Sequence, residues 1–264
     1  MPNQVDYDSV SSTYDRRYQD NPLHIIRDAL EDLISESGAR TILEVGCGTG
    51  HWLANLAAPG RRLLGLDPSR GMLQCAYSRM KNLHLYRSTA RFLPFQAGSI
   101  NLLYVVNAFH HFKDPAGFLR EAWRVLTEGG ILSVIGNDPM HPQYQWYIYD
   151  WFPGTYPRDL ERFECWSYLK QWASETGFSR LQKRTLHTIE ECSFGREVFD
   201  NPFLKKSASS QLILLSDEDY EAGLEKMKQA INHAEKAGQQ IHFQTVLPVE
   251  MFRAEKPAAP IGRL

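Results

Sequence analysis

The chain of 264 residues is 43% hydrophobic and 23% charged, so it is able to bury a sizeable core and is not disordered by composition. Its 29 basic and 31 acidic residues give a formal net charge of -2, which leaves no overall excess of positive charge for nucleic acid or an anionic membrane surface. Neither kind of partner is therefore expected.

The four cysteines are scattered along the chain without the spacing of a zinc site, so they are expected to be free thiols and no metal is predicted. The N-terminus is polar and lacks the apolar run of a signal peptide, and no apolar stretch is long enough to span a membrane. These features predict a cytoplasmic protein without a membrane anchor.

The first half of the chain alternates short apolar, β-rich runs with helical patterns, which predicts strand-helix-strand crossovers and a parallel sheet. Gly38 closes the first helical pattern, and Pro68 and Pro115 each suit the first turn of a helix. The predicted helices cover 22–37, 51–58, 68–80 and 115–126, and the predicted strands cover 41–45, 62–66, 83–86, 100–106 and 131–135.

The alternation breaks after Asn137, because residues 138–158 contain four prolines and a dense set of tyrosines and tryptophans. This segment is expected to be an insertion over the sheet. A helix over 166–176, a strand over 180–189, a polar helix over 217–237 and a last strand over 243–253 are predicted beyond it. Residues 192–216 show no pattern that assigns them.

A glycine-rich turn, Gly46-Cys-Gly-Thr-Gly50, follows the first predicted strand and lets a ligand approach the backbone closely. A dinucleotide fingerprint reads G-x-G-x-x-G, and here the third glycine comes one residue early, so NAD is disfavoured. Asp67, twenty-one residues after Gly46, is placed to accept hydrogen bonds from two ribose hydroxyls. An adenosine without phosphates fits both features.

Five segments in order, Ile42–Gly50, Leu64–Pro68, Leu93–Phe95, His110–Pro115 and Leu126–Leu132, resemble the class I S-adenosylmethionine (SAM) dependent methyltransferases. The likeness is to the small-molecule branch that includes quinone and natural-product methylating enzymes. It covers roughly residues 41–135 and fades outside them.

The resemblance implies an α/β, Rossmann-like, seven-stranded and mostly parallel sheet with one reversed edge strand and helices on both faces. One methyltransferase domain, 1–264, is expected. Within it, 1–40 would be a helical segment over the cofactor, 41–137 the cofactor-binding core, and 138–178 and 192–237 an aromatic-rich cap that holds the substrate.

For the cofactor, the resemblance implies that Glu44 and the backbone of the glycine turn hold the methionine part, Asp67 the ribose and Pro68 one face of adenine. Thr89 stands where the family usually has an acidic residue, and its hydroxyl is still able to accept the adenine amino group. The expected SAM-binding residues are Tyr14, Glu44, Gly46, Cys47, Gly48, Gly50, Asp67, Pro68, Thr89, Ala90 and Asn107.

Methyl transfer requires an aligned acceptor and exclusion of water rather than a nucleophilic residue. A hydroxyl acceptor would need a base, and His110 or His111 is the candidate. The aromatic insertion is the candidate acceptor pocket, with Asp138, Trp146, Tyr149 and Trp151 as its expected substrate residues.

The expected function is methylation of a small, aromatic or polycyclic, apolar acceptor by a monomer or homodimer. Oxygen is the first expectation for the methylated atom, with carbon and nitrogen also open. A silent SAM-binding regulator, an RNA or protein methyltransferase, and a nucleotide-dependent oxidoreductase are the alternatives, and the sequence does not identify the acceptor.

Overall fold

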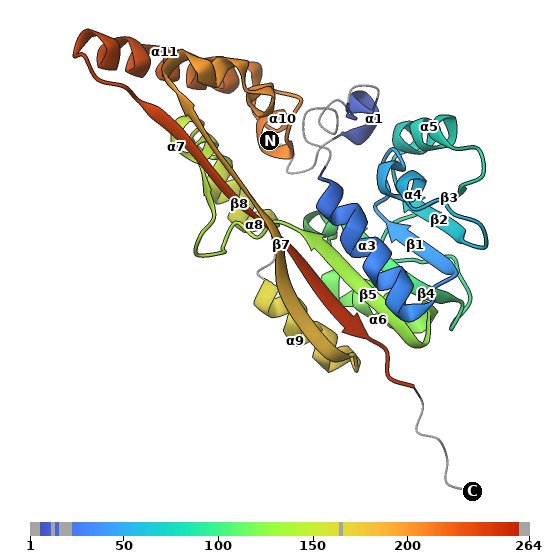
Figure 1. Ribbon diagram of the computed structural model, residues 1–264. Helices are drawn as coiled ribbons and strands as arrows, with labels where there is room; N and C mark the ends of the chain where they lie inside the picture. Colours follow the sequence, from blue (N-terminus) through green and yellow to red (C-terminus); the bar gives the residue numbers. More distant parts are fainter. Residues whose placement is uncertain (1–5, 12–13, 16–22, 164–165, 259–264) are drawn as a thin grey trace, which may run out of the picture.

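A computed structural model of the chain describes residues 6–11, 14–15, 23–163 and 166–258 (Figure 1). Its first half follows the predicted alternation, and the bounds of each element differ from the predicted ones by a few residues. The elements are α1 (Tyr7–Val10), α3 (His24–Ser37), β1 (Thr41–Val45), α4 (His51–Asn55), β2 (Arg62–Asp67), α5 (Arg70–Arg79), β3 (His84–Arg87), β4 (Ile100–Val106), the 3₁₀ turn η1 (Phe109–His111), α6 (Pro115–Val125) and β5 (Leu126–Gly136).

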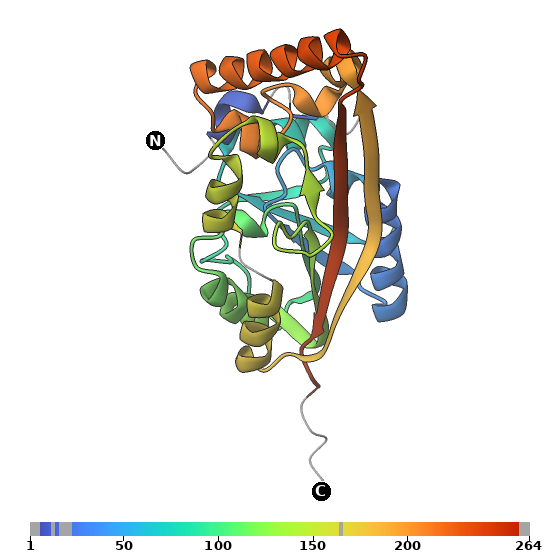
Figure 2. The same ribbon diagram turned by 90° about the vertical axis from the view of Figure 1, so that its left-hand side faces the viewer.

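The second half contains two long strands and a group of helices (Figures 1 and 2). The elements are β6 (Gln145–Trp146), α7 (Ile148–Trp151), α8 (Thr155–Arg162), α9 (Trp166–Thr176), β7 (Ser179–Phe194), η2 (Gly195–Asp200), η3 (Pro202–Leu204), α10 (Ser210–Ile213), α11 (Asp217–Lys236) and β8 (His242–Glu255). The helices α7, α8, η2, η3, α10 and α11 are called the cap below.

Local sequence explains where the helices that flank the site begin and end. Ser69 accepts a hydrogen bond from the Met72 amide at the start of α5, and Asp114 does the same for the Gly117 amide at the start of α6. Gly38 ends α3 in the left-handed conformation with φ of 62°. These caps set the loops that follow β2 and precede α6.

The sheet confirms the mostly parallel α/β fold but corrects its details. Its order is β3-β2-β1-β4-β5-β8-β6, with β7 paired to β8, which makes eight strands rather than seven. The five strands from β3 to β5 are parallel, and β8 is antiparallel to β5, β6 and β7. The reversed strand is therefore not at the edge, because β7 covers its far side. The eighth strand, β6, forms where β8 runs past the end of β5.

Alternating side chains of the sheet pack into two apolar layers. Leu43 and Leu103 face a layer completed by α6 and α9, whereas Ile42 and Leu102 face one completed by α3 and α4. A third apolar cluster holds the cap together around Phe152, and it includes residues from α7, α10 and α11. The cap thus has a core of its own beside the sheet.

The strands β7 and β8 extend beyond the rest of the sheet as a two-stranded ribbon that reaches the cap helix α11 (Figures 1 and 2). They have 16 and 14 residues, longer than predicted. In the described part of the chain, no helix combines the length and the apolar character needed to cross a membrane.

Candidate functional site

The glycine turn between β1 and α4 uses its glycines for conformation and for close packing. Gly46, Gly48 and Gly50 all have positive φ, at 77°, 51° and 70°. A Cβ atom on Gly46 would lie 2.5 Å from the Cβ of Ala108, so no larger residue fits there without a shift. A Cβ on Gly48 would meet nothing within 4 Å. The backbone of the turn is therefore open on one side at Gly48.

Asp67, at the end of β2, is held against this turn. Its Oδ2 accepts a hydrogen bond from the Gly48 amide at 2.9 Å, and its Oδ1 accepts one from the Ser69 amide at 2.9 Å. The residue is only 8% exposed, and burial is the main cause that raises the pKa of its carboxyl. Each carboxylate oxygen keeps a second lone pair for a further donor.

A cavity of about 270 Å³ lies along the carboxyl ends of β1, β2 and β4 and is called the cofactor cavity below. The structure places eight of the eleven expected SAM-binding residues on its walls. They are Tyr14, Gly46, Gly48, Asp67, Pro68, Thr89, Ala90 and Asn107.

The other three expected residues do not line this cavity. Glu44 is 1% exposed and accepts a hydrogen bond from the Tyr104 hydroxyl at 3.2 Å, and burial raises its pKa well above the usual range. Cys47 is buried too, and burial raises the pKa of its thiol. A Cβ atom on Gly50 would lie 3.0 Å from the Cβ of Ala76 on α5, a tight contact. These residues support the turn from behind.

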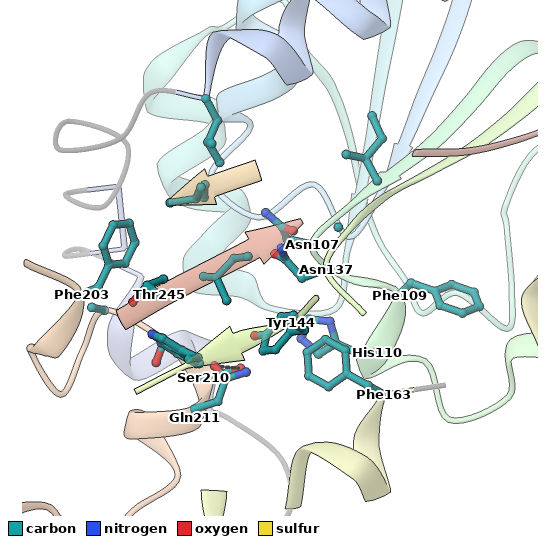
Figure 3. Close-up of a pocket in the computed structure, with 18 of the residues that line it drawn as sticks. Asn107, Phe109, His110, Asn137, Tyr144, Phe163, Phe203, Ser210, Gln211 and Thr245 are labelled. Carbon is teal, nitrogen blue, oxygen red and sulfur yellow. Dashed lines mark hydrogen bonds between the residues drawn. The ribbon is translucent and has the colours of Figure 1, made fainter. Parts of the chain in front are cut away.

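A second cavity, of about 190 Å³, lies between the ends of β4 and β5, the ribbon and the cap (Figure 3). Aromatic side chains from distant segments form much of its wall. They are Tyr7, Tyr14, Phe109, Tyr144, Trp146, Tyr147, Phe163, Trp166 and Phe203.

Of the four expected substrate residues, only Trp146 lines the second cavity. The Asp138 carboxylate accepts hydrogen bonds from the amides of Met140 and Trp166, so it braces the chain between β5 and α9. Tyr149 donates to Asp159 at 2.7 Å, and the Trp151 ring packs on Phe243 of β8. Asp138, Tyr149 and Trp151 therefore lie behind the wall.

The two cavities meet, because Tyr7, Tyr14, Asn107 and His111 line both of them. The Tyr7 hydroxyl and His111 Nε2 are hydrogen-bonded at 2.6 Å. Asn107 follows β4 with φ of 50°, in the left-handed region, and its amide donates to the carbonyl of Ile135 on β5. These four residues are called the junction.

The two candidate bases differ in their surroundings. His111 belongs to the junction, whereas His110 lines only the second cavity. His110 stacks on Phe163, with ring centroids 4.1 Å apart and planes at 12° (Figure 3). The structure thus gives the two histidines different positions relative to the cofactor cavity.

Several wall residues were missed from the sequence. Tyr7 lies on α1, which is tied to α5 because Asp8 accepts hydrogen bonds from the Ser69 hydroxyl and the Gly71 amide. Ser210 and Gln211 line the second cavity from residues 192–216, which no pattern assigned. The sequence signal for Tyr7 was that Tyr7-Asp8 repeats the pair Tyr14-Asp15.

The cofactor cavity coincides with a recognisable domain. Residues 43–134 match a family model described as a methyltransferase domain. A demethylmenaquinone methyltransferase of Lactococcus lactis is 29% identical over 126 residues, which are 44% of this chain and 50% of that protein. The chain thus spans about half the length of this curated relative.

Solved structures share the fold at low sequence identity. A protein of Anabaena variabilis, described as a methyltransferase from an antibiotic biosynthesis pathway, has a TM-score of 0.64 at 18% identity over 86% of this chain and 96% of that chain. A Haemonchus contortus phosphoethanolamine N-methyltransferase in complex with SAM has a TM-score of 0.58 at 15% identity over 95% of this chain and 57% of that chain. Residues 43–134 therefore form a methyltransferase domain, on a fold that a SAM-bound methyltransferase shares.

Proposed function

We propose that the whole protein transfers a methyl group from SAM to an oxygen atom of a small, largely apolar, ring-containing acceptor. The observation that supports this most directly is the junction, where Tyr7, Tyr14, Asn107 and His111 line both cavities. A donor in the cofactor cavity and an acceptor in the second cavity would meet there. The name of the Lactococcus lactis relative makes a quinone-like acceptor the first class to test.

The walls of the cofactor cavity suit the parts of SAM. Asp67 offers two fixed carboxylate oxygens for the ribose hydroxyls, and Gly48 leaves open space beside its backbone. Pro68, Thr89 and Ala90 lie on the same wall as Asp67 and would hold adenine. When bound, SAM supplies an electrophilic methyl group on a sulfonium.

We assign proton removal from the acceptor hydroxyl to His111. Its imidazole is at the junction, and the Tyr7 hydroxyl at 2.6 Å from Nε2 fixes the orientation of the ring. Tyr7 is accordingly a positioning residue. The aromatic wall of the second cavity would keep water from the reacting oxygen and offers apolar surface to a ring system.

The first experiment is calorimetric titration of the protein with S-adenosylhomocysteine beside NAD. Micromolar binding of S-adenosylhomocysteine alone is the expected result. Binding of NAD alone, or of neither compound, would refute the cofactor assignment.

The second experiment measures methyl transfer from tritiated SAM to 2-naphthol and to reduced naphthoquinones. Substitution His111→Asn is expected to lower kcat by about 10²–10⁴, the usual contribution of a general base, with little effect on the KM for SAM. His187→Asn is the matched control, because this histidine of β7 is exposed and lines neither cavity. An unchanged kcat in His111→Asn would exclude His111 as the base.

A further inference from the structure

The floor of the second cavity is formed by two rows of side chains on the ribbon. Glu191 of β7 pairs with Thr245 of β8, and Ile189 pairs with Leu247 two residues away. Thr245 also pairs with Trp146 of β6. Alternate residues of a strand share a face, and all five of these residues line the cavity.

The two rows differ in polarity. The row of Ile189 and Leu247 is apolar and lies nearer to β5, because β8 pairs with β5 from Glu250 onward. The outer row presents the Glu191 carboxylate and the Thr245 hydroxyl. In Figure 3, Thr245 lies beside Phe203 at one end of the cavity, away from His110. The floor of the cavity therefore changes from apolar to polar with distance from β5.

Two further polar groups stand at this outer end. Tyr147 lines the cavity and is 2% exposed, and its hydroxyl has no hydrogen-bond partner among the described residues. An unpaired buried hydroxyl is costly unless a ligand supplies the missing partner. Asn201 Nδ2 donates to Glu191 Oε2 at 3.3 Å, which orients the carboxylate and leaves Oε1 for another donor.

The outer end of the second cavity carries negative charge and no positive charge from lysine or arginine among the described residues. Among the described residues that line the second cavity, Glu191 is the one carboxylate, and none is lysine or arginine. A carboxylate or phosphate on the acceptor would find no cation on these walls and would be repelled by Glu191. A group that donates hydrogen bonds, neutral or positively charged, is complementary to it.

We propose that Tyr147, Glu191 and Thr245 form a distal subsite that binds a hydrogen-bond-donating group of the acceptor, a hydroxyl or an ammonium, and rejects anionic groups. The inference rests on the proposed function, since it concerns the far end of the same acceptor. It narrows the acceptor to a molecule with an apolar body and polar groups at both ends.

The length of the acceptor follows from the strand. The side-chain Nδ2 of Asn137, the residue after β5, donates to the carbonyl of Pro248 at 2.7 Å, and Thr245 lies three residues before Pro248 on β8. Three strand residues span about 10 Å. A bicyclic ring with one substituent at each end matches this span.

The test uses four 2-naphthols that carry aminomethyl, hydroxymethyl, methyl or carboxylate at carbon 6. Each is titrated by calorimetry into the protein saturated with S-adenosylhomocysteine. The hydroxymethyl probe is expected to bind about fivefold more tightly than the methyl probe, the gain of one hydrogen bond. The aminomethyl probe should bind at least as tightly, and the carboxylate probe most weakly.

Two substitutions test whether Tyr147 and Glu191 cause these differences in affinity. Tyr147→Phe should weaken binding of the hydroxymethyl probe about fivefold and leave the affinity for the methyl probe unchanged. Glu191→Gln should weaken the aminomethyl probe by up to about fivefold, a modest effect because Glu191 is exposed. Glu190→Gln, which faces the opposite side of β7, and Tyr168→Phe, which is 52% exposed on α9, are the matched controls.

Three results would overturn the proposal. The first is equal affinity for the carboxylate and aminomethyl probes. The second is an equal loss of affinity for the methyl and hydroxymethyl probes in Tyr147→Phe. The third is failure of all four probes to bind while S-adenosylhomocysteine still binds. Loss of S-adenosylhomocysteine binding to the unmodified protein is a different outcome, since it contradicts the proposed function itself.

Discussion

Substitution Gly46→Ala tests whether the glycine turn depends on close packing as well as on backbone conformation. The new Cβ would lie 2.5 Å from the Cβ of Ala108, and the residue would keep φ of 77°. Positive φ costs an alanine about 1–2 kcal/mol, and overpacking costs about 1–3 kcal/mol more. Urea unfolding at 25 °C should show a loss of about 2–5 kcal/mol in the free energy of unfolding.

Gly60→Ala separates these two causes. Gly60 has φ of 81°, close to that of Gly46, but a Cβ there would meet nothing within 4 Å. It should lose only the conformational part, about 1–2 kcal/mol. The double variant Gly46→Ala/Ala108→Gly should recover about 1–3 kcal/mol relative to the sum of the single variants. Strict additivity would refute the packing argument.

Three further predictions concern side chains at and behind the cofactor cavity. Asp67→Asn should weaken binding of S-adenosylhomocysteine at least about tenfold in calorimetry, because one acceptor oxygen becomes an amide donor; affinity within twofold of the original would exclude Asp67 as the ribose ligand. Burial raises the pKa of Glu44, so the folded chain keeps a proton that the unfolded chain loses, and stability falls as pH rises from about 4.3 toward the raised pKa. Glu44→Gln should remove this slope from the Tm measured between pH 5 and 8, and a parallel slope in the variant would contradict the assignment. Asn107→Gly should keep the free energy of unfolding within about 0.5 kcal/mol, whereas Asn107→Val should lower it by about 1–2 kcal/mol in the same urea assay, because only the former accepts φ of 50° freely.

The parallel half of the sheet could be predicted because its signals are local. The strand over 41–45 and the helix over 166–176 have the bounds that their apolar patterns and glycine stops predicted. The lengths of β7 and β8 could not be read in this way. Much of β7 is exposed, so its extent depends on pairing with β8 rather than on an apolar pattern of its own.

The candidate site likewise has one part that local sequence signals predict and one part that depends on long-range packing. The glycine turn and Asp67 form one short-range motif with a recognisable spacing, so sequence was enough to place them together. The second cavity combines Trp146, Gln211 and Thr245, which come from three separate segments. The tryptophan and tyrosine pattern indicates an aromatic wall but not which rings face inward, and Tyr149 and Trp151, which it predicts to contact the substrate, lie behind that wall.

The described walls of the cofactor cavity all lie between Tyr7 and Asp114, whereas the ribbon that floors the second cavity begins only at Ser179. The floor of the second cavity therefore comes from a part of the chain that contributes no described wall to the cofactor cavity. Exchanging the ribbon and cap for those of a protein with the same core would replace the floor and leave every described residue of the cofactor cavity in place. Such chimeras offer a route to enzymes that keep one methyl donor and differ in what they methylate.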